Sequence, residues 1–189
     1  IRNSNKTISV GKILCLGLNY NLHIDEMKSE KPSEPVIFTK PPTALLENGG
    51  KIIIPSISKN VHHEVELVVI IGKEGKHIKK EDAEKHILGF ALGLDITLRD
   101  IQSASKKKGH PWAVAKGFDT SAPISEIIPK EEIGDYNNLN LKLWVNDKLR
   151  QDGSTSKMIF KIDEITIYQN ENPVTEPTTR GGVYLANKN

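Results

Sequence analysis

The sequence predicts an α+β protein in which β-strands predominate, with a few short helices. Several apolar runs rich in β-branched residues have strand length and are bounded by Pro or Gly. An alternating segment around Asn146 and Asp147 is typical of a hairpin, and the helical patterns are few and short. The chain has 189 residues, 37% of them hydrophobic, which is enough to bury one core, so we expect a single domain.

The expected strands follow the apolar runs. We place them in 12–20, where a strand runs into a turn, and at 36–39, 51–56, 64–73 and 90–96, and in a hairpin over 139–153. Four prolines between 31 and 50 limit that segment to extended loop around its one short strand.

Three segments have a helical pattern. A charged amphipathic helix is expected over 79–86, and residues 23–30 form a short helix or a lid-like loop. The clearest helix begins at Thr97, which with Asp100 makes a capping box, and ends at Gly109. Three lysines at 106–108 stand in its last turn, where they complement the helix dipole, so they do not indicate nucleic-acid binding.

Composition excludes several classes of function. The 26 Lys and Arg residues nearly balance 24 Asp and Glu residues, and a net charge of +2 gives no general electrostatic case for nucleic acid. No apolar run approaches eighteen residues, so no membrane span is expected. The single cysteine, Cys15, excludes an internal disulfide and suits a reducing, intracellular compartment, cytoplasmic or mitochondrial.

Two glutamates interrupt the apolar segment VHHEVELVVI at 61–70. Residues two apart on a strand share a face, so Glu64 and Glu66 point the same way, about 6.5–7 Å apart along the chain. Burying two uncompensated anions costs several kcal/mol, and a divalent cation removes that cost. Asp95, at the end of the apolar run before the clearest helix, is the candidate third ligand. Oxygen ligands suit Mg²⁺, Mn²⁺ or Ca²⁺. The alternative is that the glutamates face solvent or pair with lysines.

Other polar residues admit a chemical and a structural interpretation. Lys116, in an apolar stretch beside Trp112 and Phe118, either snorkels to the surface or stabilises a developing negative charge near a metal. Lys40, in FTKPPTA, admits the same two readings.

Two further candidates come from helical spacing. His23 and Glu26 are three residues apart, so on a helical turn the carboxylate can orient the imidazole to take a proton from water. Without such a role they make a plain surface contact. Gln102 is either an amide donor to a bound acid or an exposed residue.

Six ordered motifs together resemble the fumarylacetoacetate hydrolase family, in particular its acylpyruvate hydrolase and oxaloacetate decarboxylase branch. They are GLNYNLHIDEM, PVIFTKPPTALL, HHEVELVVIIGK, GFALGLDITLRDIQ, KKKGHPWAVAKGFDTSAPIS and LKLWVNDKLRQDGSTSKMIF. The resemblance implies a mixed-sheet β roll, usually a homodimer, spanning residues 1–165.

The resemblance also implies roles for individual residues. Glu64, Glu66 and Asp95 match the family's metal triad for Mg²⁺ or Mn²⁺, and Lys116 matches its catalytic lysine. His23 and Glu26 match the lid dyad that activates water, and Lys40 and Gln102 match positions near the bound keto acid. The implied activity is metal-dependent C–C bond cleavage of small 2-oxo acids, by acylpyruvate hydrolysis or oxaloacetate decarboxylation. Alternatives are an isomerase or hydratase of related dicarboxylic keto acids, or an inactive member that lacks the C-terminal substrate loop.

The sequence departs from the family pattern at two places. Leu18 stands where the family has an arginine, which removes a basic residue near the site. Residues 166–189 lack the family's C-terminal substrate loop, and their polar composition predicts a tail of loop rather than a second domain.

Overall fold

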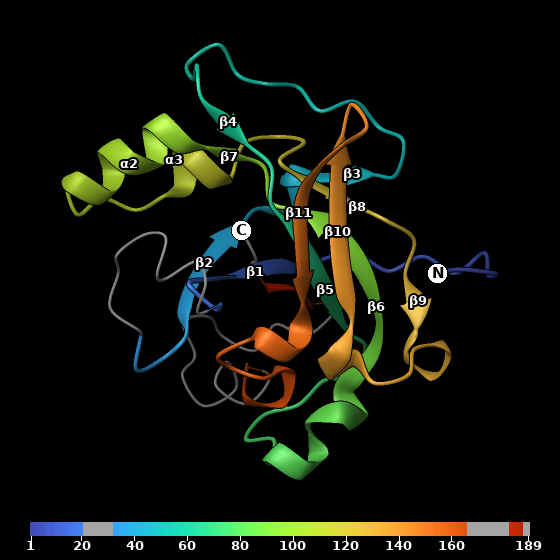
Figure 1. The fold of residues 1–189 in the computed structure, drawn as a ribbon. Helices are drawn as coiled ribbons and strands as arrows, with labels where there is room; N and C mark the ends of the chain where they lie inside the picture. The colour runs from blue at the N-terminus through green and yellow to red at the C-terminus, as the bar shows by residue number, and fades with distance from the viewer. Residues whose placement is uncertain (21–31, 166–181, 187–189) are drawn as a thin grey trace.

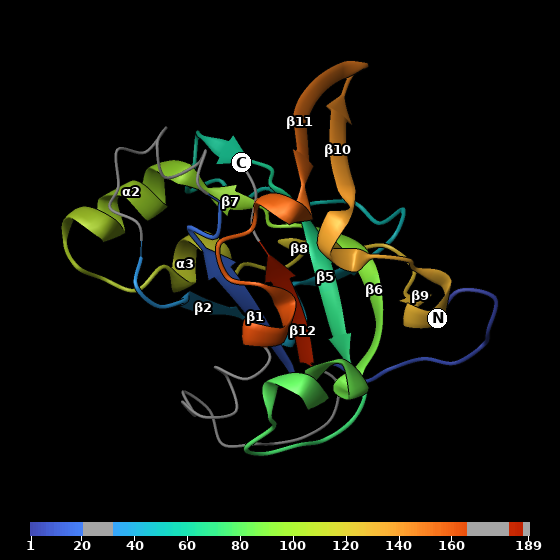
Figure 2. The ribbon, with the colours of Figure 1, turned by 60° about the horizontal axis from the view of Figure 1, so that its bottom comes forward.

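The fold is built around one large mixed sheet. The computed structural model describes residues 1–20, 32–165 and 182–186. Its main sheet has the order β2-β1-β12-β5-β6-β8-β3, with β9 paired to β6 (Figures 1 and 2). These strands are β1 (Lys12–Gly17), β2 (Val36–Lys40), β3 (Leu45–Glu47), β5 (Val65–Ile71), β6 (Ile87–Leu94), β8 (Ala122–Ile124), β9 (Ile128–Pro129) and β12 (Gly182–Ala186). The strand-rich α+β prediction and the mixed sheet are confirmed.

Smaller elements flank this sheet. Two-stranded sheets pair β10 (Asn140–Val145) with β11 (Lys148–Ser154), and β4 (Val61–His62) with β7 (Thr97–Leu98). The α-helices are α2 (Arg99–Lys107) and α3 (Ala113–Lys116). The 3-10 helices are Pro42–Ala44, Lys80–His86, Lys130–Glu132, Tyr136–Asn138 and Thr155–Lys157. None of the described helices is long and apolar enough to cross a membrane.

Strand β5 is the centre of the core, because both of its faces are buried. Val65, Leu67 and Val69 belong to one apolar cluster, whereas Val68 and Ile70 belong to a second. The alternation of a strand therefore turns Glu66 to the same side as Val68 and Ile70. A carboxylate at this position is surrounded by core, which is why its charge needs a compensating partner.

The hairpin prediction is confirmed. Asn146 and Asp147 both have positive φ angles, 48° and 61°, and they join β10 to β11. Two consecutive residues in this region are the mark of a type I′ turn, whose twist matches that of the strands that it connects.

Several expected elements differ in the structure. Residues 51–56 form no strand, and Ile53 and Ile54 are 64% and 56% exposed. The segment 79–86 is a 3-10 helix at Lys80–His86 rather than an amphipathic α-helix, and β6 starts at Ile87 rather than at 90. Residues 23–30 lie outside the described residues.

The prediction of loop for the whole of 166–189 is wrong at Gly182–Ala186. These residues form β12, which pairs in parallel with β1 and antiparallel with β5. The final segment therefore contributes a strand to the middle of the sheet. The domain boundary at 165 stays a prediction.

Candidate active site

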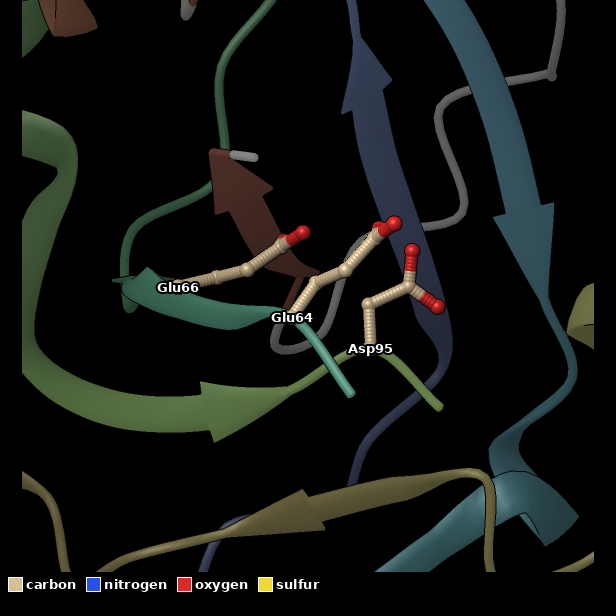
Figure 3. A group of neighbouring side chains, drawn as sticks. All are labelled: Glu64, Glu66 and Asp95. Carbon is tan, nitrogen blue, oxygen red and sulfur yellow. The ribbon is translucent and has the colours of Figure 1, made fainter. Parts of the chain in front are cut away.

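Three carboxylates meet at one end of β5. Glu64 stands just before this strand, Glu66 lies within it, and Asp95 follows β6, the neighbouring antiparallel strand (Figure 3). All three residues are buried, with relative exposures of 1%, 1% and 0%. Each offers an oxygen that lies within 4.8 Å of the others. The prediction that a shared strand face and a neighbouring strand end bring these residues together is confirmed.

Glu66 is the least compensated of the three carboxylates. Neither of its carboxylate oxygens has a hydrogen-bond partner in the described part of the chain. Its pKa is raised well above the usual value, first by burial and then by the negative charges of Asp95 and Glu64. A buried carboxylate with free oxygens beside two others is a fitting ligand set for a divalent cation.

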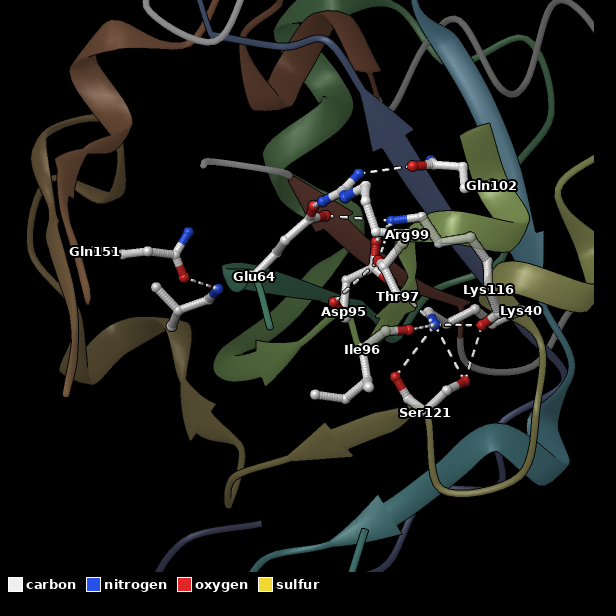
Figure 4. Close-up of polar contacts among 11 residues, drawn as sticks. Lys40, Glu64, Asp95, Ile96, Thr97, Arg99, Gln102, Lys116, Ser121 and Gln151 are labelled. Carbon is white, nitrogen blue, oxygen red and sulfur yellow. Dashed lines mark hydrogen bonds and ion pairs between the residues drawn. The ribbon is translucent and has the colours of Figure 1, made fainter. Parts of the chain in front are cut away.

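Lys116 lies among the carboxylates, as the chemical interpretation of the sequence required. Its ammonium donates to Glu64 Oε2 at 3.2 Å, to Thr97 Oγ1 at 2.6 Å, and to Asp95 (Figure 4). Burial acts to lower the pKa of Lys116, but the charges of Asp95 and Glu64 outweigh it and leave that pKa raised. The lysine is therefore a buried cation and not a snorkelling one.

Lys40 is buried at the same site, but its ammonium is turned toward the protein framework. It forms an ion pair with Asp95 at 2.9 Å and donates to the backbone oxygens of Ile96 at 3.3 Å and Ser121 at 3.1 Å. It also donates to the Ser121 hydroxyl and to the backbone oxygen of Lys116. These contacts hold Asp95 and Lys116 relative to one another. Its predicted place beside a substrate stays a prediction.

Arg99 was not singled out in the sequence, yet it belongs to the site. It is the first residue of α2, and its guanidinium contacts Glu64 and donates to Gln102 Oε1 at 2.6 Å (Figure 4). Gln102 is 4% exposed, so it is not a surface residue. The sequence does indicate that Arg99 accompanies Gln102, because a spacing of three residues puts both side chains on one helix face.

The predicted capping box is wrong. Helix α2 starts at Arg99 with Leu98 at its N-cap, and no side chain caps it. The Thr97 hydroxyl instead accepts from Lys116, and Asp100 accepts from Ser58 Oγ at 2.6 Å and from the backbone N–H of Lys59 at 3.0 Å. Both side chains are thus engaged by tertiary partners that the local pattern does not reveal. His23 and Glu26 lie outside the described residues.

Fold and site together define a mixed-sheet protein with a buried acidic triad suited to a divalent cation. The family model described as fumarylacetoacetate (FAA) hydrolase C-terminal matches residues 12–171. The chain belongs to this family.

Named relatives agree with the assignment. Oxaloacetate tautomerase FAHD1, mitochondrial, of Bos taurus is 48% identical over 156 residues, which are 82% of this chain and 71% of that protein. The Mus musculus protein of the same name is 49% identical with the same coverage. The crystal structure of fumarylpyruvate hydrolase from Pseudomonas aeruginosa, in complex with Mn²⁺ and pyruvate, superposes with a TM-score of 0.88 at 33% identity. That match covers 99% of this chain and 82% of the other.

Proposed function

We propose that this chain is a divalent-metal-dependent enzyme that cleaves a C–C bond in small 2-oxo acids, by acylpyruvate hydrolysis, by oxaloacetate decarboxylation to pyruvate, or by both. The observation that carries the proposal is the convergence of three buried carboxylates within 4.8 Å, one of which has no hydrogen-bond partner among the described residues. Structural carboxylates in a core are normally fully paired, so this arrangement supports a ligand set.

Glu64, Glu66 and Asp95 would hold the cation, and Mg²⁺ or Mn²⁺ is the fitting choice because every ligand is a carboxylate oxygen. Held there, such a cation would supply Lewis-acid chemistry to a 2-oxo acid and would make the bond next to the keto group easier to break. The Mn²⁺ and pyruvate in the fumarylpyruvate hydrolase structure support this choice.

Lys116 would stabilise the negative charge that develops on the departing pyruvate enolate. Its ammonium already lies 3.2 Å from Glu64 and contacts Asp95, so it stands beside the reacting group of any acid held there. Lys40 keeps Asp95 in place through their 2.9 Å ion pair. Arg99 contacts Glu64 and Gln102, and the side chains of Arg99 and Gln102 would donate to the substrate's carboxylate.

For an acylpyruvate, His23 and Glu26 would take a proton from a water molecule, whose oxygen then attacks the distal carbonyl carbon. The C–C bond breaks, the acyl group leaves as a carboxylic acid that contains the water oxygen, and the electron pair passes to the pyruvate enolate. A proton taken up at the enolate carbon gives pyruvate. Oxaloacetate needs no water, because loss of CO₂ leaves the electron pair on the same carbon. One site therefore serves both reactions.

A second candidate function is tautomerisation of oxaloacetate. The named relatives at 48–49% identity carry this activity in their names. Moving a proton between carbon and oxygen passes through an enolate of the same kind, so the same lysine and ligand set serve it. A hydratase of related keto acids and an inactive family member are the remaining alternatives.

The test is turnover by the whole chain with Mg²⁺, using acetylpyruvate and oxaloacetate, beside a Glu64→Gln variant. We expect pyruvate from at least one substrate, and a loss of at least about a hundredfold in kcat/KM in the variant. Following the keto and enol forms of oxaloacetate by ultraviolet absorbance separates tautomerisation from decarboxylation. Turnover that is unchanged in Glu64→Gln would contradict the proposed site. No turnover of any of these acids would favour the inactive alternative.

We also propose that the chain forms a homodimer in the cytoplasm or mitochondrial matrix, and the mitochondrial relatives support this location. Ile53, Ile54 and Ile57 are 64%, 56% and 58% exposed, and such a group of apolar side chains is typical of an interaction surface. Sedimentation velocity should give twice the 21.0 kDa of the chain. A sedimenting mass equal to one chain at micromolar concentration would contradict the dimer.

A further inference from the structure

Three polar side chains share one face of α2, and the first of them contacts the acidic site. Arg99, Gln102 and Lys106 follow one another at intervals of three and four residues, the spacing that stacks side chains on one side of a helix. Arg99 and Gln102 already contact each other, and Arg99 contacts Glu64. Lys106 therefore extends the same stripe one turn further along the helix.

Lys106 packs against an aromatic side chain. Its ammonium lies 5.0 Å from the ring centroid of Trp112, the residue before α3. Trp112 meets Phe38 edge to face at 5.6 Å, and the ammonium of Lys116 lies 4.8 Å from the Phe38 ring centroid. The ammonium groups of two lysines thus flank one pair of rings. Lys116 is buried, and Lys106 is exposed. Figure 1 shows the two helices that carry them lying together.

The charges of the buried site set what kind of acid it favours. Three carboxylates face three cations, which are Lys40, Arg99 and Lys116. With Glu66 ionised, as a metal ligand must be, these six charges cancel, and a bound divalent cation would bring the loaded site to a net charge of +2. A 2-oxo monocarboxylate neutralises half of that charge, whereas a 2-oxo dicarboxylate neutralises all of it. Charge balance in a buried site therefore favours the dianion.

The distal carboxylate of such a dianion needs a further cation near the site. Among the residues that the structure describes, Lys106 has no ion-pair partner, in contrast to Lys116 and Arg99. The pKa of Lys106 is lowered, first by desolvation and then by the positive charges of Arg99 and Lys116, whereas Glu64 acts to raise it. The ammonium of Lys106 is therefore close enough to interact with the charged groups of the site.

We propose that Lys106 binds the distal carboxylate of a 2-oxo dicarboxylic acid and so makes the enzyme selective for dianionic substrates over neutral-tailed acylpyruvates. This inference rests on the proposed function of the acidic site. Lys106 is a specificity residue in it: it touches the far end of the substrate and takes no part in breaking the bond.

The test compares Lys106→Gln with Lys107→Gln in the whole chain with Mg²⁺. Lys107 is also exposed on α2, but about 100° away around the helix axis. For oxaloacetate we expect Lys106→Gln to lower kcat/KM by about ten- to a hundredfold, mainly through a higher KM, because a charged hydrogen bond is lost. For acetylpyruvate the change should stay below about threefold. Lys107→Gln should leave both unchanged, and Lys106→Arg should retain the preference.

A binding measurement keeps this inference separate from the catalytic proposal. Thermal-shift titrations with Mn²⁺ compare malate, which carries the distal carboxylate, with lactate, which lacks it. The wild type should bind malate more tightly than lactate. Lys106→Gln should reduce that difference in affinity. Equal losses on oxaloacetate and acetylpyruvate, no loss on either, or equal binding of malate and lactate by the wild type would overturn the role of Lys106. The wild type could also bind malate more tightly than lactate and yet turn over no 2-oxo acid. That result would support the role of Lys106 and contradict the proposed activity.

Discussion

Replacement of Glu66 by glutamine should abolish divalent-metal binding and turnover while making the metal-free protein more stable. Both oxygens of Glu66 are buried without a hydrogen-bond partner in the described structure, so the ionised carboxylate costs free energy until a cation binds. Glutamine keeps the shape, carries no charge, and offers N–H groups to the neighbouring carboxylates. We expect activity to fall by at least about a thousandfold, because the loss of one of three ligands removes the ion.

The stability gain should depend on pH, and its sign follows from the raised pKa of Glu66. In the unfolded chain this group loses its proton near its ordinary pKa of about 4.3. In the folded protein burial, Asp95 and Glu64 hold the proton to a higher pH. The folded state therefore loses stability as the pH rises from the unfolded pKa to the folded one. We expect Glu66→Gln to match the wild type near pH 4 and to exceed it by about 1–3 kcal/mol near pH 8.

Urea unfolding in EDTA at both pH values, together with a Mn²⁺ titration, measures these effects. Saturating Mn²⁺ at a hundredfold above Kd should add about 2.7 kcal/mol to the wild type and nothing to the variant. The matched control is Glu74→Gln, an exposed glutamate, which should change neither quantity. A variant that binds Mn²⁺ as tightly as the wild type would remove Glu66 from the ligand set.

The acidic triad was predictable from the sequence because its members are charged residues in strand-like apolar runs. Glu64 and Glu66 share a side by strand alternation, and Asp95 ends the run that becomes the antiparallel neighbour of β5. An acidic residue in an apolar, strand-like run thus predicts a buried carboxylate, and a buried carboxylate needs a compensating partner. The residues themselves make Lys116, Lys40 and Gln102 candidates, each with a structural alternative, and the resemblance to the family gives them roles near the site. The structure buries all three, with Lys116 and Lys40 against Asp95 and Gln102 against Arg99.

The residues that escaped prediction are those whose roles come from tertiary contacts. Arg99 reads as an ordinary arginine in the first turn of a helix, and only the fold brings its guanidinium to Glu64. The capping pattern at Thr97 failed because its hydroxyl has a stronger partner in a buried ammonium.

Two segments show that β-propensity is a weak guide without a pairing partner. The isoleucines at 52–54 have strand composition, yet their segment pairs with no strand in the described structure. Residues 182–186 lie in a polar tail, yet they pair with β1 and β5, which are more than a hundred residues away in sequence. Strand formation in both cases is decided by which edges the rest of the fold offers.

Replacement of Lys116 by methionine should destabilise the protein strongly, and a divalent cation should restore much of the loss. The ammonium of Lys116 contacts Glu64 and Asp95, and removing one partner from a buried ion pair costs about 3–5 kcal/mol because the remaining charge is left uncompensated. Lys40 and Arg99 still face these carboxylates, so we expect a value near the lower end, about 3 kcal/mol. Activity should fall by about a hundred- to a thousandfold.

The raised pKa of Lys116 fixes the pH range in which this deficit is visible. The lysine contributes stability fully below its unfolded pKa of about 10.4, and the contribution is lost only as the pH rises through the higher folded pKa. The loss of unfolding free energy in Lys116→Met that comes from this ammonium should therefore be constant between about pH 6 and pH 9. Urea unfolding in EDTA at both limits measures it, with Lys76→Met as a control at an exposed lysine.

A double variant distinguishes lost charge compensation from lost packing. If the ammonium acts by balancing Glu64, then Glu64→Gln in the Lys116→Met background should recover stability, with a coupling energy of about 1–3 kcal/mol between the two sites. Saturating Mg²⁺ should likewise narrow the gap between Lys116→Met and the wild type, because the ion supplies the missing positive charge. A deficit that neither Mg²⁺ nor the second substitution reduces would mean that Lys116 acts through its packed methylene chain, and its assignment to the charge balance of the site would then be wrong.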